Sequence, residues 1–238
     1  MQSKSRTARW SEISFDMSKR KEILDIVFCY TGTMLGVLAV RFFNMYVMMS
    51  IPLVPRMAVI IAAYWVIALA AIIITLIRKE PAKTYGFFKD KMLIQIGIGV
   101  AIAIAMSVVF TLIPHLAGFG QFFDSGSRYN YFWQYIFEFV YCIVSVGFVE
   151  EYVFRGFIFG KLQKICRNNV LPVIISSALF GLFHIFNGNI FQVLMTAGIG
   201  ALFCLCRIKI KNCSTLSLVI AHGVYDAMIT VWANVLLK

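Results

Sequence analysis

The sequence predicts an all-α membrane protein, a polytopic bundle of about seven transmembrane helices with its N-terminus in the cytoplasm. Hydrophobic residues make up 61% of the chain and charged residues only 14%, whereas soluble domains are about 45–50% apolar. The apolar residues form continuous runs of about 20, the length that a helix needs to cross a bilayer. These runs do not alternate apolar with polar residues, so they favour a helical bundle over a β-barrel.

Seven runs are expected to be spans, and prolines separate several of them. The runs are residues 23–40, 57–77, 92–113, 131–160, 170–186, 189–206 and 214–237. The prolines between spans are Pro52, Pro55, Pro81 and Pro114. Proline has no amide hydrogen and breaks a helix interior, so helices are expected to end there. Residues 41–56 are also apolar, and three alternatives stay open for them: an extension of the first helix, a segment that lies at the membrane interface, or an eighth short membrane segment.

The positions of the basic residues predict the orientation. With the N-terminus in the cytoplasm, 17 of the 22 lysines and arginines fall on the cytoplasmic side, in segments 1–22, 78–91, 161–169 and 207–213. This agrees with the positive-inside rule, and an eighth full span would break the agreement. The net charge of +11 therefore indicates orientation and contact with anionic lipid, and we expect no nucleic-acid partner.

Six ionisable residues lie deep inside the predicted spans. They are Glu150, Glu151, Arg155, His184, His222 and Asp226. At about 1.5 Å per residue, Glu150, His184 and His222 lie about 16, 21 and 12 Å from the predicted cytoplasmic ends of their spans. Ionisable groups at such depth are costly and are functional by default. A buried ionic network that only holds the bundle together is the alternative.

Helical spacing separates these groups by face. Glu151 and Arg155 are four positions apart, so they share a face and are expected to form a buried pair. Glu150 points about 100° away from Glu151 and is left for chemistry. His222 and Asp226 also share a face. If the fifth span packs between the fourth and the seventh, Glu150, His184 and His222 converge on one cavity.

Four glycines in the same spans are expected to let the helices approach closely or to leave room for substrate. They are Gly147, Gly156, Gly181 and Gly223.

A carboxylate beside two imidazoles can activate water, so hydrolysis of an amide in or beside the membrane is the natural prediction. The sequence contains neither HExxH nor GxSxG, which disfavours a zincin and a serine nucleophile. Three other classes stay open. A proton-coupled transporter uses similar groups, although no inverted repeat is visible. A haem protein with His184 and His222 as axial ligands and a catalytically lapsed, peptide-binding membrane protein are the others.

Three motifs occur in order within the predicted spans. EEYVFR (150–155), FGLFH (180–184) and HGVYD (222–226) resemble the EExxxR, FxxxH and Hxxx(N/D) motifs of the CAAX protease and bacteriocin-processing (CPBP, or Abi) family, over about residues 140–230. The resemblance implies an intramembrane endopeptidase in which Glu150 and His184 activate water. It also implies that His222 and Asp226 form an oxyanion site. Glu151 and Arg155 would support the first motif. The candidate catalytic residues are therefore Glu150, Glu151, His184, His222 and Asp226, with Arg155 and Phe180 as structural support.

The resemblance leaves the cofactor open. The family is often named as metalloproteases, yet a metal-independent glutamate mechanism also fits its members. Glu150, His184 and His222 would be the ligands of zinc or another divalent metal, since two imidazoles and a carboxylate make an adequate set. Asp226 stands where the prenyl-protein enzymes have asparagine, and an ionised carboxylate cannot donate to an oxyanion. It is therefore protonated, orients His222, or joins a metal site.

The expected organisation has three parts: a basic cytoplasmic arm (1–22), a variable region of three spans (23–130) and a CPBP-like catalytic core of four spans (131–238). The expected partners are the lipid bilayer and a membrane-associated substrate such as a prenylated protein, a bacteriocin precursor or a signal peptide precursor. The expected location is the plasma membrane of a bacterium, because the chain is small and has no extra domain.

Overall fold

The computed structural model describes residues 2–120 and 129–236, with the side chains of 17–120, 129–186 and 188–235. Within these ranges the chain forms helices and connections and no strand, which confirms the all-α prediction. Six of the described helices are long and apolar enough to cross a membrane: Met17–Tyr46, Leu53–Arg78, Met92–Phe119, Phe132–Ile165, Ile190–Lys209 and Thr215–Val235. A further apolar helix, Val170–Phe183, is shorter.

The elements follow one another along the chain with few long connections. In order they are α1 (Gln2–Tyr46), η1 (Met48–Ser50), α2 (Leu53–Tyr64), η2 (Trp65–Ala68), α3 (Leu69–Arg78), η3 (Ala82–Tyr85), α4 (Met92–Ser107), η4 (Val108–Leu112), η5 (His115–Phe119), α5 (Phe132–Tyr141), η7 (Cys142–Gly147), α6 (Phe148–Glu151), η8 (Tyr152–Ile158), α7 (Phe159–Ile165), α8 (Val170–Phe183), η9 (Ile185–Asn187), α9 (Ile190–Lys209) and α10 (Thr215–Leu236). Of the short elements, η4, η5, η7 and η8 are π-helical, and η1, η2, η3 and η9 are 3₁₀ turns.

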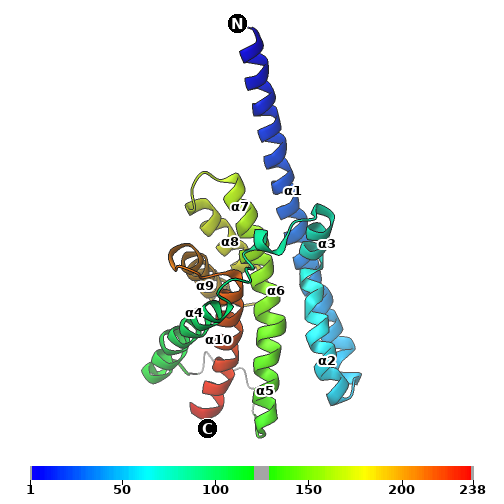
Figure 1. Cartoon of the computed structure of the whole chain (residues 1–238). Coiled ribbons are helices and arrows are strands. Elements are labelled where there is room, and N and C mark those ends of the chain that lie inside the picture. The colour runs from blue at the N-terminus through cyan, green and yellow to red at the C-terminus, as the bar shows by residue number, and fades with distance from the viewer. Residues whose placement is uncertain (1, 121–128, 237–238) are drawn as a thin grey trace.

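Residues 41–56 do not form an eighth span. Helix α1 continues through Arg41 to Tyr46, a 3₁₀ turn follows, and α2 begins at Leu53 directly after Pro52. The start of α1 and the end of α10 lie at opposite ends of the molecule (Figure 1). Which end faces the cytoplasm stays a prediction.

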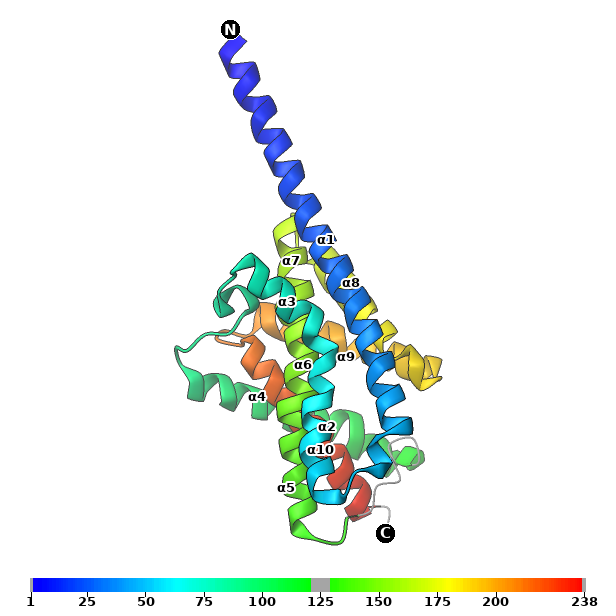
Figure 2. The ribbon, with the colours of Figure 1, turned by 90° about the vertical axis from the view of Figure 1, so that its right-hand side faces the viewer.

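One long apolar helix, α5 to α7, runs through the middle of the bundle (Figure 1). Helices α2 and α3 lie on one side of it and α10 on the other. Helix α8 packs against α9 as a hairpin, and the connection between them lies at about the height of α6 in Figure 2. Helix α8, with 14 residues, spans about 21 Å, which is less than the roughly 30 Å of a bilayer core.

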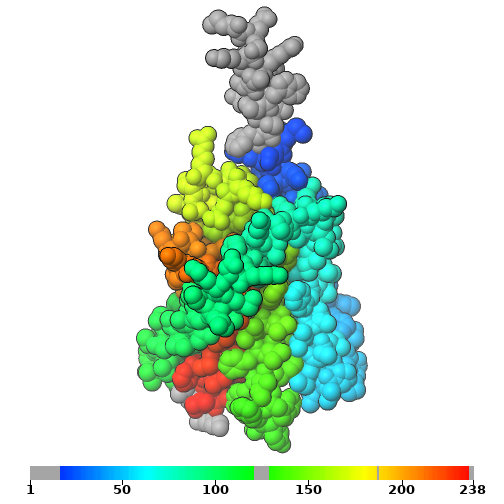
Figure 3. All heavy atoms as spheres, in the orientation of Figure 1, coloured from blue at the N-terminus to red at the C-terminus, as the bar shows by residue number. Residues whose placement is uncertain are grey.

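The outer surface of the bundle is strongly apolar. Large hydrophobic side chains are exposed on several helices, for example Phe42, Leu93 and Phe132. On the face in view in Figure 3, α2 (cyan) lies beside α5 (green). Apolar surface of this extent marks contact with another apolar medium. For a bundle of spanning helices that medium is lipid.

The central helix carries π-helical turns on both sides of α6. Such turns leave backbone groups without their usual partners and are frequent at functional sites. In η8, the carbonyl of Phe154 accepts a hydrogen bond from Ser176 Oγ at 3.0 Å. The carbonyl of Arg155 accepts one from the guanidinium of Arg207. Donors from α8 and α9 thus stabilise the irregular turn that follows the two glutamates.

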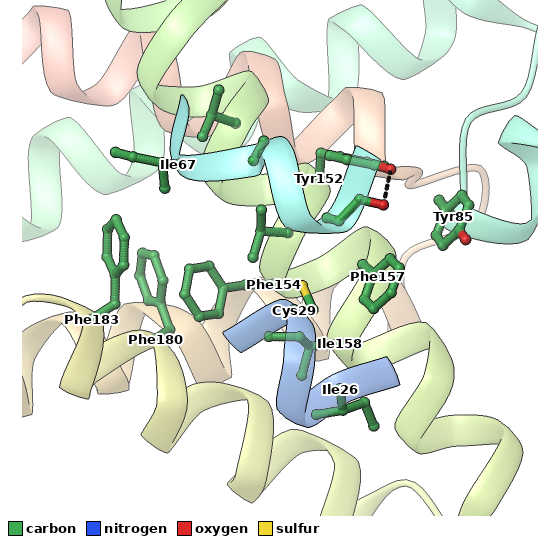
Figure 4. Packing of buried hydrophobic residues seen from close by; sticks show 14 of the residues in the cluster. Ile26, Cys29, Ile67, Tyr85, Tyr152, Phe154, Phe157, Ile158, Phe180 and Phe183 are labelled. Carbon is green, nitrogen blue, oxygen red and sulfur yellow. Dashed lines mark hydrogen bonds between the residues drawn. The ribbon is translucent and has the colours of Figure 1, made fainter. Parts of the chain in front are cut away.

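Aromatic packing fixes η8 between α1 and α8. Figure 4 shows Phe154 facing Phe180 and Phe183 of α8, with Cys29 of α1 close by. The ring of Phe154 lies 5.0 Å from that of Phe180 and 5.3 Å from that of Phe183. This packing holds α8, and with it the FGLFH motif, against the helix that carries the glutamates.

Two glycines bring α10 against the central helix. A Cβ on Gly223 would lie 2.5 Å from the Cα of Ile143, and one on Gly147 would lie 2.7 Å from the carbonyl oxygen of Val219. Real Cβ atoms do not approach backbone so closely. The expectation that these glycines allow close helix approach is confirmed.

The central helix extends further than predicted. Its last turns run to Ile165 instead of ending near residue 160, and Lys161 lies inside α7 with a side chain that is only 1% exposed. Carboxylates of Glu22, Asp25 and Glu80 lie 2.7, 3.0 and 3.4 Å from its Nζ. The assignment of Lys161 to a loop was wrong because these partners, from distant parts of the chain, cannot be read from local sequence.

Candidate active site

The structure gathers four of the predicted catalytic residues around one cavity. The cavity has a volume of about 450 Å³, and the predicted catalytic residues Glu150, His184, His222 and Asp226 line it, together with the predicted supporting residue Phe180. They come from α6, from the end of α8 and from α10. The convergence that helical spacing and depth predicted is therefore present in the fold.

The two adjacent glutamates point to different surroundings. Glu150 lines the cavity, whereas Glu151 is fully buried and binds two side chains. Its Oε1 lies 2.9 Å from Arg155 Nη1 and 2.7 Å from His222 Nδ1. The buried pair of Glu151 with Arg155 is as predicted, and the bond to His222 is a second role that the spacing did not show.

His222 lies among three carboxylates. Because the carboxylate of Glu151 only accepts hydrogen bonds, it favours a proton on Nδ1. The other nitrogen, Nε2, is 3.3 Å from Asp226 Oδ2 and 3.8 Å from Glu150 Oε2. This geometry favours one of the three readings of Asp226, in which it orients His222.

His184 ends α8 and is partly exposed to the cavity. Its Nδ1 lies 3.0 Å from the carbonyl oxygen of Phe180. A carbonyl can only accept, so Nδ1 is the donor and Nε2 keeps its lone pair. His184 thus has an unprotonated nitrogen and lines the same cavity as Glu150.

The ring of Phe180 contacts the guanidinium of Arg155 and both imidazole rings of the site. The guanidinium carbon of Arg155 lies 4.0 Å from the centre of its ring, a cation–π distance. The ring also meets His184 and His222 edge to face, at 5.0 and 6.0 Å between centroids. The predicted supporting residues Arg155 and Phe180 therefore pack together, and Phe180 also lines the cavity.

Sequence reasoning missed Tyr64, at the end of α2. Its hydroxyl donates a hydrogen bond to Oε1 of Glu150, and its side chain lines the cavity. Residues 23–130 were expected to be a variable region, so no residue there was considered for the site. The available signal was a tyrosine in a long apolar run, because a buried tyrosine hydroxyl usually finds a partner.

The second oxygen of Glu150 is buried and unbonded. Among the described residues, Oε2 of Glu150 has no hydrogen-bond partner, although it faces Nε2 of His222. A buried carboxylate oxygen without a partner is costly. It is therefore a position where a bound water would be stabilised.

The described part of the chain contains no group of three or more His, Cys, Asp or Glu side chains placed to hold a metal ion. Glu150, His184 and His222 are zinc-type ligands in kind, and Nε2 of His222 is left free by the bond of Nδ1 to Glu151, but the three side chains do not form such a group. In this arrangement the three do not fit a metal, and metal dependence stays a prediction.

Comparison with known proteins gives one match. The family model described as "Type II CAAX prenyl endopeptidase Rce1-like" matches residues 131–228. No curated protein and no solved structure matches the chain. The matched segment includes all three motifs and excludes Tyr64. Residues 131–228 are therefore similar to an Rce1-like domain, which agrees with the resemblance to the CPBP family over this part of the chain.

Proposed function

We propose that this protein is an intramembrane endopeptidase that hydrolyses a peptide bond of a membrane-associated protein or peptide. The Rce1-like domain supports a peptidase in general. The observation that carries the mechanism is the buried, unbonded Oε2 of Glu150, facing a cavity that His184 and His222 also line.

In the proposed reaction, a water molecule binds between Oε2 of Glu150 and Nε2 of His184. Glu150 takes a proton from it while the water oxygen attacks the carbonyl carbon of the scissile bond. A tetrahedral intermediate with one negative oxygen results. Glu150 then returns the proton to the leaving nitrogen, the C–N bond breaks, and a carboxylic acid and an amine leave.

His222 would stabilise the negative oxygen. A donor aimed at a developing oxyanion is worth a large part of the rate of acyl transfer. To donate from Nε2 while Nδ1 is bonded to Glu151, the ring must carry both protons. Glu151 and Asp226, at 2.7 and 3.3 Å, would stabilise this positive charge, which gives Asp226 a role without making it a donor.

The test compares peptide termini in the membranes and medium of cells that carry the wild type, Glu150→Ala or His184→Ala at equal expression. We expect new termini only with the wild type. Glu138→Gln is the matched control, because this carboxylate lies on the same long helix but is bonded to Tyr129 and Thr230 instead of lining the cavity. Identical termini in all strains under several growth conditions would instead favour a proton-coupled transporter or a lapsed enzyme.

Metal dependence needs its own test. If a divalent metal binds, it would polarise water and the substrate carbonyl. Since the three candidate ligands are not arranged around one point, we expect cleavage to persist after treatment with a strong chelator. Loss of cleavage that added zinc restores would contradict this prediction and establish a metallopeptidase.

We also propose a class of substrate and a membrane in which the protein acts. Candidate substrates are a prenylated protein, a bacteriocin precursor or a signal peptide precursor. The proposed setting is the plasma membrane of a bacterium, with the start of α1 in the cytoplasm. The clustering of basic residues at segments 1–22, 78–91, 161–169 and 207–213 supports this orientation.

A further inference from the structure

Tyr64 contacts the proposed general base from outside the Rce1-like domain. It lies 86 positions before Glu150 in sequence, and it ends α2, where the chain passes into the 3₁₀ turn η2. Its ring meets that of Tyr141 edge to face at 6.1 Å. The hydroxyl therefore reaches Glu150 from a ring that a neighbouring aromatic side chain holds in place.

The backbone that carries Tyr64 is tied to the central helix. Ser145 of η7 is fully buried, and its Oγ donates to the carbonyl of Ile61 at 3.3 Å. Ile61 lies three positions before Tyr64, one helical turn away. This bond links α2, which carries Tyr64, to the helix that carries Glu150. It therefore fixes the backbone of Tyr64 relative to that of Glu150.

The hydrogen bond from the Tyr64 hydroxyl to Glu150 decides which carboxylate oxygen of Glu150 is left to accept a proton. The terminal torsion of a glutamate is soft, so the carboxylate plane is poorly fixed by the side chain itself. A donor on Oε1 fixes that plane and leaves Oε2 toward Nε2 of His222. Oε2 is the oxygen that has no partner among the described residues.

We infer that Tyr64 is a positioning residue of the active site, which holds Glu150 through Oε1 so that Oε2 accepts the proton of the attacking water. The inference rests on the proposed peptidase function. It assigns part of the catalytic arrangement to the N-terminal half of the chain.

The experiment compares Tyr64→Phe with Tyr152→Phe in the purified full-length protein. Both remove one hydroxyl from a tyrosine that bonds across helices, but Tyr152 bonds to Thr75 at 2.7 Å and does not line the cavity. The probe is a quenched fluorescent peptide that spans the cleavage site found by the comparison of termini. We expect Tyr64→Phe to lower kcat about tenfold or more with KM nearly unchanged, since orientation acts on the chemical step. Tyr152→Phe should leave both nearly unchanged.

A double-mutant cycle on thermal unfolding tests the contact without activity. Tyr64→Phe should lower the unfolding temperature in the wild type and have a smaller effect in Glu150→Ala, because its partner is then absent. Additive effects would show that the hydroxyl does not act through Glu150 and would overturn the inference.

The remaining outcomes separate the two proposals. Suppose that the wild type cleaves and Glu150→Ala does not, so that the peptidase function holds. An unchanged kcat in Tyr64→Phe, or an equal loss of kcat in Tyr152→Phe, then overturns the role of Tyr64 and leaves the peptidase function standing. If the wild type itself creates no new termini, the peptidase function fails and the role of Tyr64 fails with it.

Discussion

At the scale of single residues, two adjacent glutamates have different environments. Glu150 faces the cavity and bonds Tyr64, whereas Glu151 bonds Arg155 and His222 in a fully buried position. The helix turns each side chain by about 100° relative to the last. Two identical side chains thus lie in different surroundings, one lining the cavity and one in a buried ion pair.

Arg155 is the residue whose loss should most affect stability. It is fully buried against Glu151 and Phe180, so Arg155→Ala removes the guanidinium from a buried carboxylate and leaves it with His222 as its remaining partner. Breaking a buried pair in this way costs about 3–5 kcal/mol. Thermal unfolding in detergent should show a clearly lower transition temperature and a reduced yield of folded protein.

Arg56→Ala is the control for this prediction. Its guanidinium bonds the carbonyls of Ile51 and Met49 near the surface, so no buried charge is stranded. A transition for Arg155→Ala that matches the wild type would contradict the structural pairing.

At the scale of elements, the site depends on how closely α10 approaches the central helix. His222 and Asp226 lie on α10, beside Gly223, whose Cα faces the backbone at Ile143. The long helix and α10 share a contact that only glycine permits. A change in this packing would displace both members of the HGVYD motif.

Gly223→Ala should therefore destabilise the protein and reduce cleavage. An added methyl group in a tight backbone contact typically costs about 1–3 kcal/mol. Gly198→Ala in α9 is the matched control, because a Cβ there meets nothing within 4 Å and alanine favours a helix. Equal unfolding temperatures for the two variants would show that α10 has room to move.

At the scale of the whole molecule, an ionic cluster joins three segments at the end of the bundle nearer the start of α1. Lys161 of α7 contacts Glu22 and Asp25 of α1 and Glu80 after α3. Arg78 also pairs with Asp25 at 2.8 Å. The cluster ties α1 and the end of α3 to the central helix.

The cluster predicts a dependence of stability on pH. Burial alone would raise the pKa of Glu80, but the hydroxyl of Tyr85 and the ammonium groups of Lys164 and Lys161 outweigh it and hold the pKa below the ordinary value of 4.5. A lowered pKa in the folded state stabilises the fold above the ordinary value, and this contribution disappears as the pH falls through the folded pKa. Wild type should unfold at a higher temperature than Glu80→Gln at neutral pH, and the difference should shrink in acid below 4.5. A difference that stays constant with pH would exclude an ionised Glu80 as its source.

Much of the fold was predictable because a membrane restricts the backbone. Buried amides must bond within their own helix, so apolar runs became helices close to the predicted positions. The pair of Glu151 and Arg155 was also predictable, since both lie on one helix at a fixed spacing. Prediction was weaker for the ends of helices, as at Lys161, where partners from other segments decide how far the helix continues.

The sequence by itself determined the fold class, the apolar helices and the three motifs, because hydrophobic length and helical periodicity are local properties of a chain. Only the tertiary structure decided the partners across helices: Tyr64 with Glu150, His222 with Glu151, and Lys161 with its three carboxylates. These contacts depend on which helices are neighbours and on how each is rotated. Periodicity gives the face on which a side chain lies but not the helix that the face meets.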